Sequence, residues 1–128
     1  MAFDLGGLTR RLRNLRCCPS PPAVTGVEAQ PGGGSGEVVV VWDPLPAGAD
    51  VALYRVYERK GVGTWWHLAV VDDSALGLLV PGKLGLVDAP DYWPWPTIGV
   101  ADRCYTVTAV SRRGLEGPMS AEACSSPP

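Results

Sequence analysis

Histidine is nearly absent from this 128-residue chain, which has only His67. Nucleophilic catalysis needs a base beside the nucleophile, and histidine is the commonest one. Strand alternation places His67 on the face opposite Trp66 and Leu68, where it points outward. No serine or cysteine has the sequence context of a nucleophile, and no glycine-rich loop leads from a strand into a helix. The sequence therefore predicts a protein that is not an enzyme and holds no cofactor.

Long apolar runs are also absent. No stretch approaches the roughly 18 apolar residues of a membrane span. The chain begins MAFDLGGLTRRLRNLRCC, in which the arginines follow the leucines, contrary to the order of a secretory leader. We therefore expect synthesis in the cytoplasm and no membrane span.

Positive charge is scarce outside the first residues. Residues 1–16 hold four arginines and one aspartate, a net charge of +3, so the remainder carries −5 of the total of −2. An acidic body without a basic, aromatic-rich stripe excludes nucleic acid as the expected partner.

Glycine and proline are abundant, with 16 and 13 residues. Strong helix formers are sparse after residue 20, whereas valine, tryptophan, tyrosine and threonine are common, which favours strands joined by tight turns. Turn signals recur about every 8–12 residues, the pattern of an all-β, two-sheet antiparallel sandwich of about seven strands. Beyond a first strand near 24–29, we expect strands at 37–43, 51–60, 64–73, within 76–88, at 102–111 and at 118–125.

The first 20 residues form a separate segment. Their apolar residues recur every three or four positions, which indicates a short amphipathic helix over roughly residues 7–16. The sequence CCPSPP then imposes an extended linker. We assign 1–20 to an N-terminal arm and 21–128 to one domain. The expected docking residues of the arm are Phe3, Leu5, Leu8, Leu12 and Leu15.

A helix this short is marginal in water and needs a surface to lie on. Three surfaces remain open: its own domain, a partner chain, or a membrane surface, which basic amphipathic segments also bind.

Four motifs of the body resemble the fibronectin type III family. They are Trp42 in VVVVWDP, YRVY at 54–57, CYTVTAV at 104–110 and GLEGPMS at 114–120, and they occur in the order and spacing of the family. The resemblance covers roughly residues 21–126. It implies an immunoglobulin-like sandwich and says little of function, since this fold hosts many roles.

Two departures accompany the resemblance. Arg103 stands two positions before Tyr105, where the family has a tyrosine that hydrogen-bonds to the backbone. The loop SRRGLEG contains no Arg-Gly-Asp, so integrin binding is not expected.

Four cysteines allow three pairings. In a hairpin centred on Gly114, opposed residues have numbers that sum to 228, as those of Cys104 and Cys124 do. Opposed Cβ atoms lie about 4.5–5.5 Å apart, close to the span of a disulfide. We predict this disulfide; the alternative is two reduced thiols packed as small apolar side chains.

Cys17 and Cys18 are adjacent in the linker, as free thiols or in an intermolecular bridge. With only the distant His67 they do not form a four-ligand zinc set. Aspartates at 72–73 and 88–91 lie at turns, where aspartate commonly caps the backbone. Although calcium there is an alternative, we expect no metal.

The stretch PDYWPWP at 90–96 cannot be a central strand, because its prolines lack ladder donors. Its aromatic residues, Tyr92, Trp93 and Trp95, are the kind that anchors interfaces. Three uses remain open: closing the edge of the sandwich, contacting a neighbouring subunit, or stacking on a sugar.

A disulfide is rarely kept in the cytosol, whereas the sequence shows no secretory leader. A virus particle assembled inside the cell and released by lysis reconciles these observations. We therefore expect a phage capsid or tail decoration protein, or a minor structural protein, docked by its arm to protein partners that include copies of itself. The alternative is a cell-surface or secreted binding module, with carbohydrate as one ligand.

Deleting residues 1–18 should leave a cooperatively folded β-rich domain, because the expected core lies later in the chain. That core comprises Trp42, Tyr54, Val56, Tyr105 and Val107. Circular dichroism and thermal melting of the truncated chain test this. An unfolded truncation would mean that the arm belongs to the core.

Overall fold

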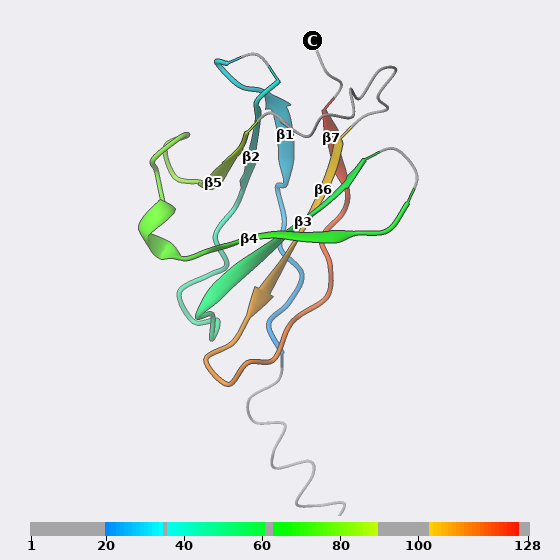
Figure 1. Cartoon of the computed structure of the whole chain (residues 1–128). Helices are drawn as coiled ribbons and strands as arrows, with labels where there is room; N and C mark the ends of the chain where they lie inside the picture. The colour runs from blue at the N-terminus through cyan, green and yellow to red at the C-terminus, as the bar shows by residue number, and fades with distance from the viewer. Residues whose placement is uncertain (1–19, 35, 61–62, 90–102, 126–128) are drawn as a thin grey trace, which may run out of the picture.

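Two antiparallel sheets face each other in the computed structural model, which describes residues 20–34, 36–60, 63–89 and 103–125 (Figure 1). The first sheet has the order β1-β2-β5 and the second the order β4-β3-β6-β7. The chain is therefore an all-β immunoglobulin-like sandwich, as predicted. The strands are β1 (Glu28–Pro31), β2 (Val38–Trp42), β3 (Leu53–Lys60), β4 (Trp66–Val71), β5 (Leu84–Asp88), β6 (Arg103–Val110) and β7 (Ala123–Ser125); η2 (Asp73–Ala75) is a short 3-10 helix between β4 and β5.

The first strand begins later than predicted. Val24 is buried in the core, and the Thr25 carbonyl accepts a hydrogen bond of 3.0 Å from the Asp43 amide, but the ladder starts only at Glu28. Gly26 interrupts the extended chain with a φ of +71°, and a Cβ there would lie 2.2 Å from the Asp43 carboxylate. Since only glycine adopts this conformation readily, the chain bends at Gly26 before β1 begins.

The core forms where the alternating apolar residues of both sheets meet. All five predicted core residues are buried, with Trp42 and Tyr54 in ring contact at 5.8 Å between centroids. The Tyr54 hydroxyl accepts a 3.0 Å hydrogen bond from the Leu45 amide, so this ring fills the core and also holds the loop after β2.

The register between β3 and β4 shifts at a β-bulge, between Val56 and Tyr57 on β3. Simple alternation therefore gives the wrong face for part of β4. Simple alternation along β4 would place Val70 on the same face as Trp66 and Leu68. The register instead pairs Val70 with Arg55 on the outer face, where Val70 is 53% exposed. One extra residue in a strand reverses which face every later residue occupies, and the sequence alternation does not reveal it.

Arg103, two positions before Tyr105, ties the two sheets together. From the start of β6, its guanidinium donates to the Gly36 carbonyl before β2 at 2.5 Å and to the Ala89 carbonyl after β5 at 3.2 Å. It also forms an ion pair of 2.5 Å with Asp88 at the end of β5. Arg103 thus links the start of β6 in the second sheet to the start of β2 and the end of β5 in the first.

The surroundings of Arg103 keep its partners in defined protonation states. The Tyr105 hydroxyl donates to Asp88 at 2.6 Å, and Glu58 Oε2 lies 3.5 Å from Arg103 Nε. Burial alone would raise the pKa of Asp88, but hydrogen bonding with Glu58 and Tyr105 and the charge of Arg103 outweigh it and lower that pKa. Burial and the hydrogen bond to Asp88 raise the pKa of Tyr105, so its hydroxyl stays a donor.

Replacing Arg103 with methionine should lower the free energy of unfolding by about 3–5 kcal/mol, because it leaves buried carboxylates without their cation. Urea denaturation measures the difference. Arg112→Met is the matched control: this side chain is 76% exposed and pairs with Asp50 at 3.0 Å, so its loss should cost at most about 1 kcal/mol. Equal, small effects of both substitutions would contradict a clamping role for Arg103.

Candidate interaction surface

His67 lies in β4, exposed as predicted, with its ring 5.5 Å from that of Tyr57 in an edge-to-face contact. Within the described residues it makes no hydrogen bond to a hydroxyl or a thiol. The described part of the chain therefore does not pair its histidine with a nucleophile in the manner of a catalytic dyad.

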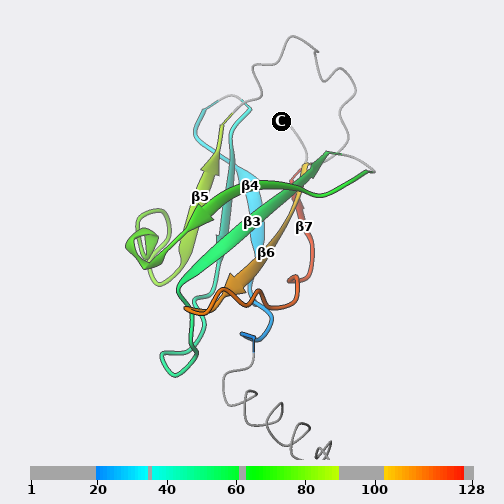
Figure 2. The same cartoon turned by 60° about the horizontal axis from the view of Figure 1, so that its bottom comes forward.

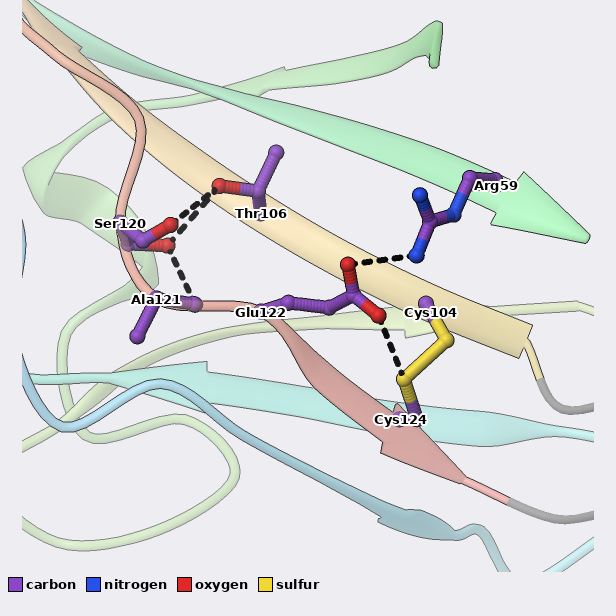
Figure 3. Close-up of polar contacts among 7 residues, drawn as sticks. All are labelled: Arg59, Cys104, Thr106, Ser120, Ala121, Glu122 and Cys124. Carbon is purple, nitrogen blue, oxygen red and sulfur yellow. Dashed lines mark hydrogen bonds and ion pairs between the residues drawn. A yellow bond between two sulfur atoms is a disulfide. The ribbon is translucent and has the colours of Figure 1, made fainter. Parts of the chain in front are cut away.

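The disulfide links facing positions of the last two strands. Cys104 in β6 and Cys124 in β7 are register partners, with an S–S distance of 2.06 Å (Figure 3). This is the pairing that the hairpin numbering predicts. Glu122 lies beside it, 3.2 Å from Cys124 Sγ, and its other oxygen forms a 2.6 Å ion pair with Arg59 on β3. The outer face of the second sheet is therefore held covalently and ionically across β3, β6 and β7.

Cys104, Glu122 and Cys124 place their possible ligand atoms within 4.8 Å of one another. A thiolate, not a disulfide sulfur, is the cysteine form that binds metal. While the disulfide is intact, this trio is therefore a structural contact rather than a metal site.

The segment before β7 is fixed onto β6 by hydroxyl groups. Thr106 Oγ1 donates to the Ser120 carbonyl at 2.9 Å (Figure 3). The Ser120 hydroxyl accepts from the Val107 amide at 2.9 Å. Thr106 and Thr108 are consequently 2% and 1% exposed, although they lie on the outer face of β6. These contacts leave little of β6 accessible to a partner.

The carboxylate of Glu116 is also occupied by contacts within the domain. It accepts hydrogen bonds from the Tyr57 hydroxyl and from Thr108 Oγ1, and it pairs with Arg55 at 3.3 Å. Burial would raise the pKa of Glu116, but the hydrogen bonds from Thr108 and Tyr57 and the charge of Arg55 lower it. An ionised carboxylate so fully engaged holds the loop before β7 and is a poor general base.

The outer face of the first sheet is apolar at β2 and β5, although Val41 is only 1% exposed there. Since Val38, Val40 and Trp42 point into the core, Val39 and Val41 point to the opposite face of β2. Register pairs Val39 with Val87 of β5, which is 40% exposed. Together with Leu79, which is 41% exposed, these residues define what we term the valine face: Val39, Val41, Leu79 and Val87.

Gly85 allows the loop after η2 to reach this face. It is the register partner of Val41, and a Cβ on Gly85 would lie 2.9 Å from Leu79 Cδ1 and 3.2 Å from Val41 Cγ1. Leu79 can therefore lie over the sheet only because position 85 has no side chain. The loop runs beside β5 in both views (Figures 1 and 2), and it exposes Leu76 and Leu78 as well, at 49% and 73%.

Acidic residues border the valine face. By strand alternation, Glu37 and Asp43 flank the two outward valines of β2, and Glu28 is the register partner of Val41. Lys83 forms an ion pair with Asp43 at 2.7 Å, and hydrogen bonding to Asp43 raises the pKa of Lys83. With three carboxylates and one lysine, the border has a net charge of −2.

An open hollow of about 380 Å³ adjoins the valine face at Gly85, between the edge strands β4 and β5. Its lining is mixed: Val70, Val71, Asp72, Ser74, Ala75, Gly85 and Leu86. Asp72 caps η2 by accepting a 2.9 Å hydrogen bond from the Ser74 amide, so this carboxylate has a local structural partner. The hollow is therefore best described as the margin of the apolar surface.

The structure brings together one predicted pair, Cys104 and Cys124. The other predicted site residues lie outside the described residues: Phe3, Leu5, Leu8, Leu12, Leu15, Tyr92, Trp93 and Trp95. Sequence reasoning missed the valine face. The available signal was the run of four valines at 38–41, which leaves neither face of that strand polar.

Comparison with known proteins identifies a fold but no family. No family model and no curated protein matches the chain. A β-1,2-glucanase from Parabacteroides distasonis is similar at 17% identity and a TM-score of 0.51, over 82% of this chain and 12% of that one. Titin module A71 from human cardiac muscle is similar at 16% identity and a TM-score of 0.49, over 83% of this chain and 89% of that one.

In the part of the chain that the structure describes, no helix has the length and apolar character needed to cross a membrane.

Replacing Cys104 and Cys124 together with alanine should lower the free energy of unfolding by about 3 kcal/mol on the chain-entropy model, because the disulfide closes a loop of sequence separation 20. Chemical denaturation measures this loss, and peptide mapping without reductant should recover the two peptides linked. Cys17→Ser with Cys18→Ser is the control and should leave stability unchanged. Free alkylation of Cys104 and Cys124 in mature protein would contradict the prediction.

Proposed function

We propose that this chain is a non-enzymatic interaction module of the fibronectin type III kind. The four sequence motifs support this assignment, and so does the strand order. In the constant type of immunoglobulin domain, the fourth strand pairs with the first sheet, whereas β4 here pairs with β3 of the second sheet. A module of this kind contributes surfaces rather than chemistry.

The observation that carries the proposal is the exposed apolar surface around β5. Val87, Leu76, Leu78 and Leu79 each expose at least 40% of their area, and they lie on one strand and its adjoining loop. Apolar residues gathered in this way on a small domain mark an interaction site. The polar clusters, by contrast, are occupied by contacts within the domain.

We further propose that the partner is a larger assembly, a virus particle, in which the chain is a decoration or minor structural protein. A disulfide in so small a domain favours a final location in an oxidising environment. An arm with an apolar stripe, joined to the body by a proline-rich linker, favours docking onto another protein.

Leu8→Asp combined with Leu12→Asp should release the chain from its assembly while leaving its melting temperature unchanged. Each leucine contributes roughly 1.5–3 kcal/mol when buried, and this burial is expected against a partner. The measurement is co-sedimentation of the chain with density-purified particles from its producing cells. Thr9→Asp is the control for added negative charge between the leucines. Unaltered co-sedimentation of the double variant would contradict docking through the arm.

A carbohydrate-binding module is the second candidate. Trp66 is 71% exposed, and Trp65 lies beneath the Arg59 guanidinium at 4.6 Å, so aromatic surface is available near β4. One of the similar structures is a β-1,2-glucanase, of which the matched part is a small fraction. That likeness is one of fold, and it makes glucan a reasonable first ligand to test.

Trp93→Ala and Trp95→Ala distinguish the three uses of the aromatic stretch. If the rings close the sandwich, unfolding free energy should fall by about 3–5 kcal/mol for a fully buried ring. We expect instead that stability holds and that association with the particle weakens. Titration with soluble β-glucan, followed by tryptophan fluorescence, provides the third readout. A saturable shift in a chain that stays monomeric would favour the carbohydrate-binding candidate over the assembly protein.

A further inference from the structure

The described residues cover only part of the valine face. β2 is apolar on both faces, which is typical of a strand covered on both sides. The core covers one face; on the other, Val41 is only 1% exposed and Val39 is half-buried, but Val87 and Leu79 stay 40% and 41% exposed. We propose that this face binds the N-terminal arm of a second copy of the chain. The inference rests on the function proposed above and names the partner.

The arm and the valine face match in apolar character and in length. Leu5, Leu8, Leu12 and Leu15 recur at spacings of three and four, which would form one stripe on a helix. A ten-residue helix over 7–16 would be about 15 Å long. The five residues of β2 span about 17 Å, so one such helix covers the outward residues of β2 and β5.

Charge favours the same occupant. Residues 1–16 have a net charge of +3, with arginines at 10, 11, 13 and 16. Three carboxylates border the valine face, those of Glu28, Glu37 and Asp43, and Lys83 is paired with the last of them. An amphipathic segment whose polar residues are mainly arginine can place its leucines on the valines and its guanidinium groups at this acidic border.

The linker favours a second copy over the same chain. The Pro21 carbonyl oxygen lies 2.2 Å from where a Gly117 Cβ would be, and the Gly117 amide donates to the Ala109 carbonyl of β6 at 2.8 Å. The arm therefore joins the body beside the second sheet, whereas the valine face is on the far side of the first.

The linker is too short for the arm to reach the valine face of its own chain. Five residue steps separate Arg16 from Pro21 and extend to about 17 Å at most. The sheets lie about 10 Å apart, and the axis of a covering helix lies about another 10 Å beyond the first sheet. The required distance of about 20 Å exceeds the reach, even before the chain crosses from β1 to β5.

Docking of this kind is heterologous, because the donating and accepting surfaces are different parts of the chain. Each copy would offer one arm and one valine face, so association continues until it closes into a ring or extends as a filament. A protein that decorates a repeating lattice could use such links between adjacent copies.

A complementation experiment with full-length chains tests the proposal. All variants carry Cys17→Ser and Cys18→Ser, so that no intermolecular disulfide contributes. The face variant, Val87→Lys, keeps the arm; the arm variant, Leu8→Asp with Leu12→Asp, keeps the valine face. Sedimentation velocity over a concentration series should show association of the parent chain and at least a tenfold weaker association constant for either variant alone. An equimolar mixture of the two variants should form a 1:1 complex.

Leu115→Lys is the matched control. Leu115 is 45% exposed, close to the 40% of Val87, but it lies in the β6–β7 connection, so this variant should associate like the parent chain. Glu28→Lys should weaken association without changing the melting temperature, since it removes one exposed carboxylate of the acidic border. Circular dichroism confirms that each variant is folded.

Two results would overturn the proposal. One is a parent chain that stays monomeric over the whole series. The other is a mixture of the two variants that fails to form the complex although both are folded. In either case, arm-dependent co-sedimentation with particles would still stand as evidence for the proposed function, and only the identity of the partner would be wrong.

Discussion

The guanidinium of Arg103 is the contact on which the arrangement of the two sheets depends. Arg103 is the first residue of β6 in the second sheet. Its guanidinium donates hydrogen bonds to carbonyl groups before β2 and after β5 in the first sheet. A buried cation of this kind is stable only with its counter-ion, so Asp88 and the hydroxyl of Tyr105 belong to the same unit. By fixing the end of β5 against β6, this unit also fixes the strand that presents Val87.

The two sheets have different relations to solvent. The second sheet covers much of its own outer face, because the segment before β7 folds onto β6 and the Glu116 carboxylate holds it there. On the first sheet, the loop after η2 brings Leu79 over Gly85, Val41 is buried, and Val87 remains 40% exposed. The interaction surface proposed above therefore lies at the three-stranded sheet, where exposed apolar residues gather around β5.

The sequence was a good guide wherever the local pattern and the tertiary structure agree. Alternation predicted the core around Trp42 and Tyr54, and hairpin numbering predicted the opposition of Cys104 and Cys124, because both follow from the two-residue period of a strand. The bulge in β4 could not be predicted, since an inserted residue leaves no trace in composition. The role of Arg103 was also inaccessible, because its partners at 36, 58, 88 and 89 are distant in sequence.

The valine face was only partly predictable from the sequence. Four consecutive valines indicate a strand covered on both faces, but only the structure shows that Gly85 lets Leu79 cover part of that surface and leaves Val87 exposed. The glycine appears in the sequence as a turn residue like many others. Its significance depends on its register opposite Val41, which is a property of the sheet.

The disulfide also determines how the domain would carry mechanical load. The beginning of the described chain and β7 lie toward opposite ends of the sandwich (Figure 1), so tension on the two ends would run along its long axis. A pull on Ser125 reaches Cys124 and passes through the sulfur atoms to Cys104, directly into β6. The 105–123 segment is then a closed loop outside the load path, and β7 cannot be peeled away beyond Cys124. Tension would therefore enter the second sheet at Cys104, near the start of β6, and would not fray β7 from its end.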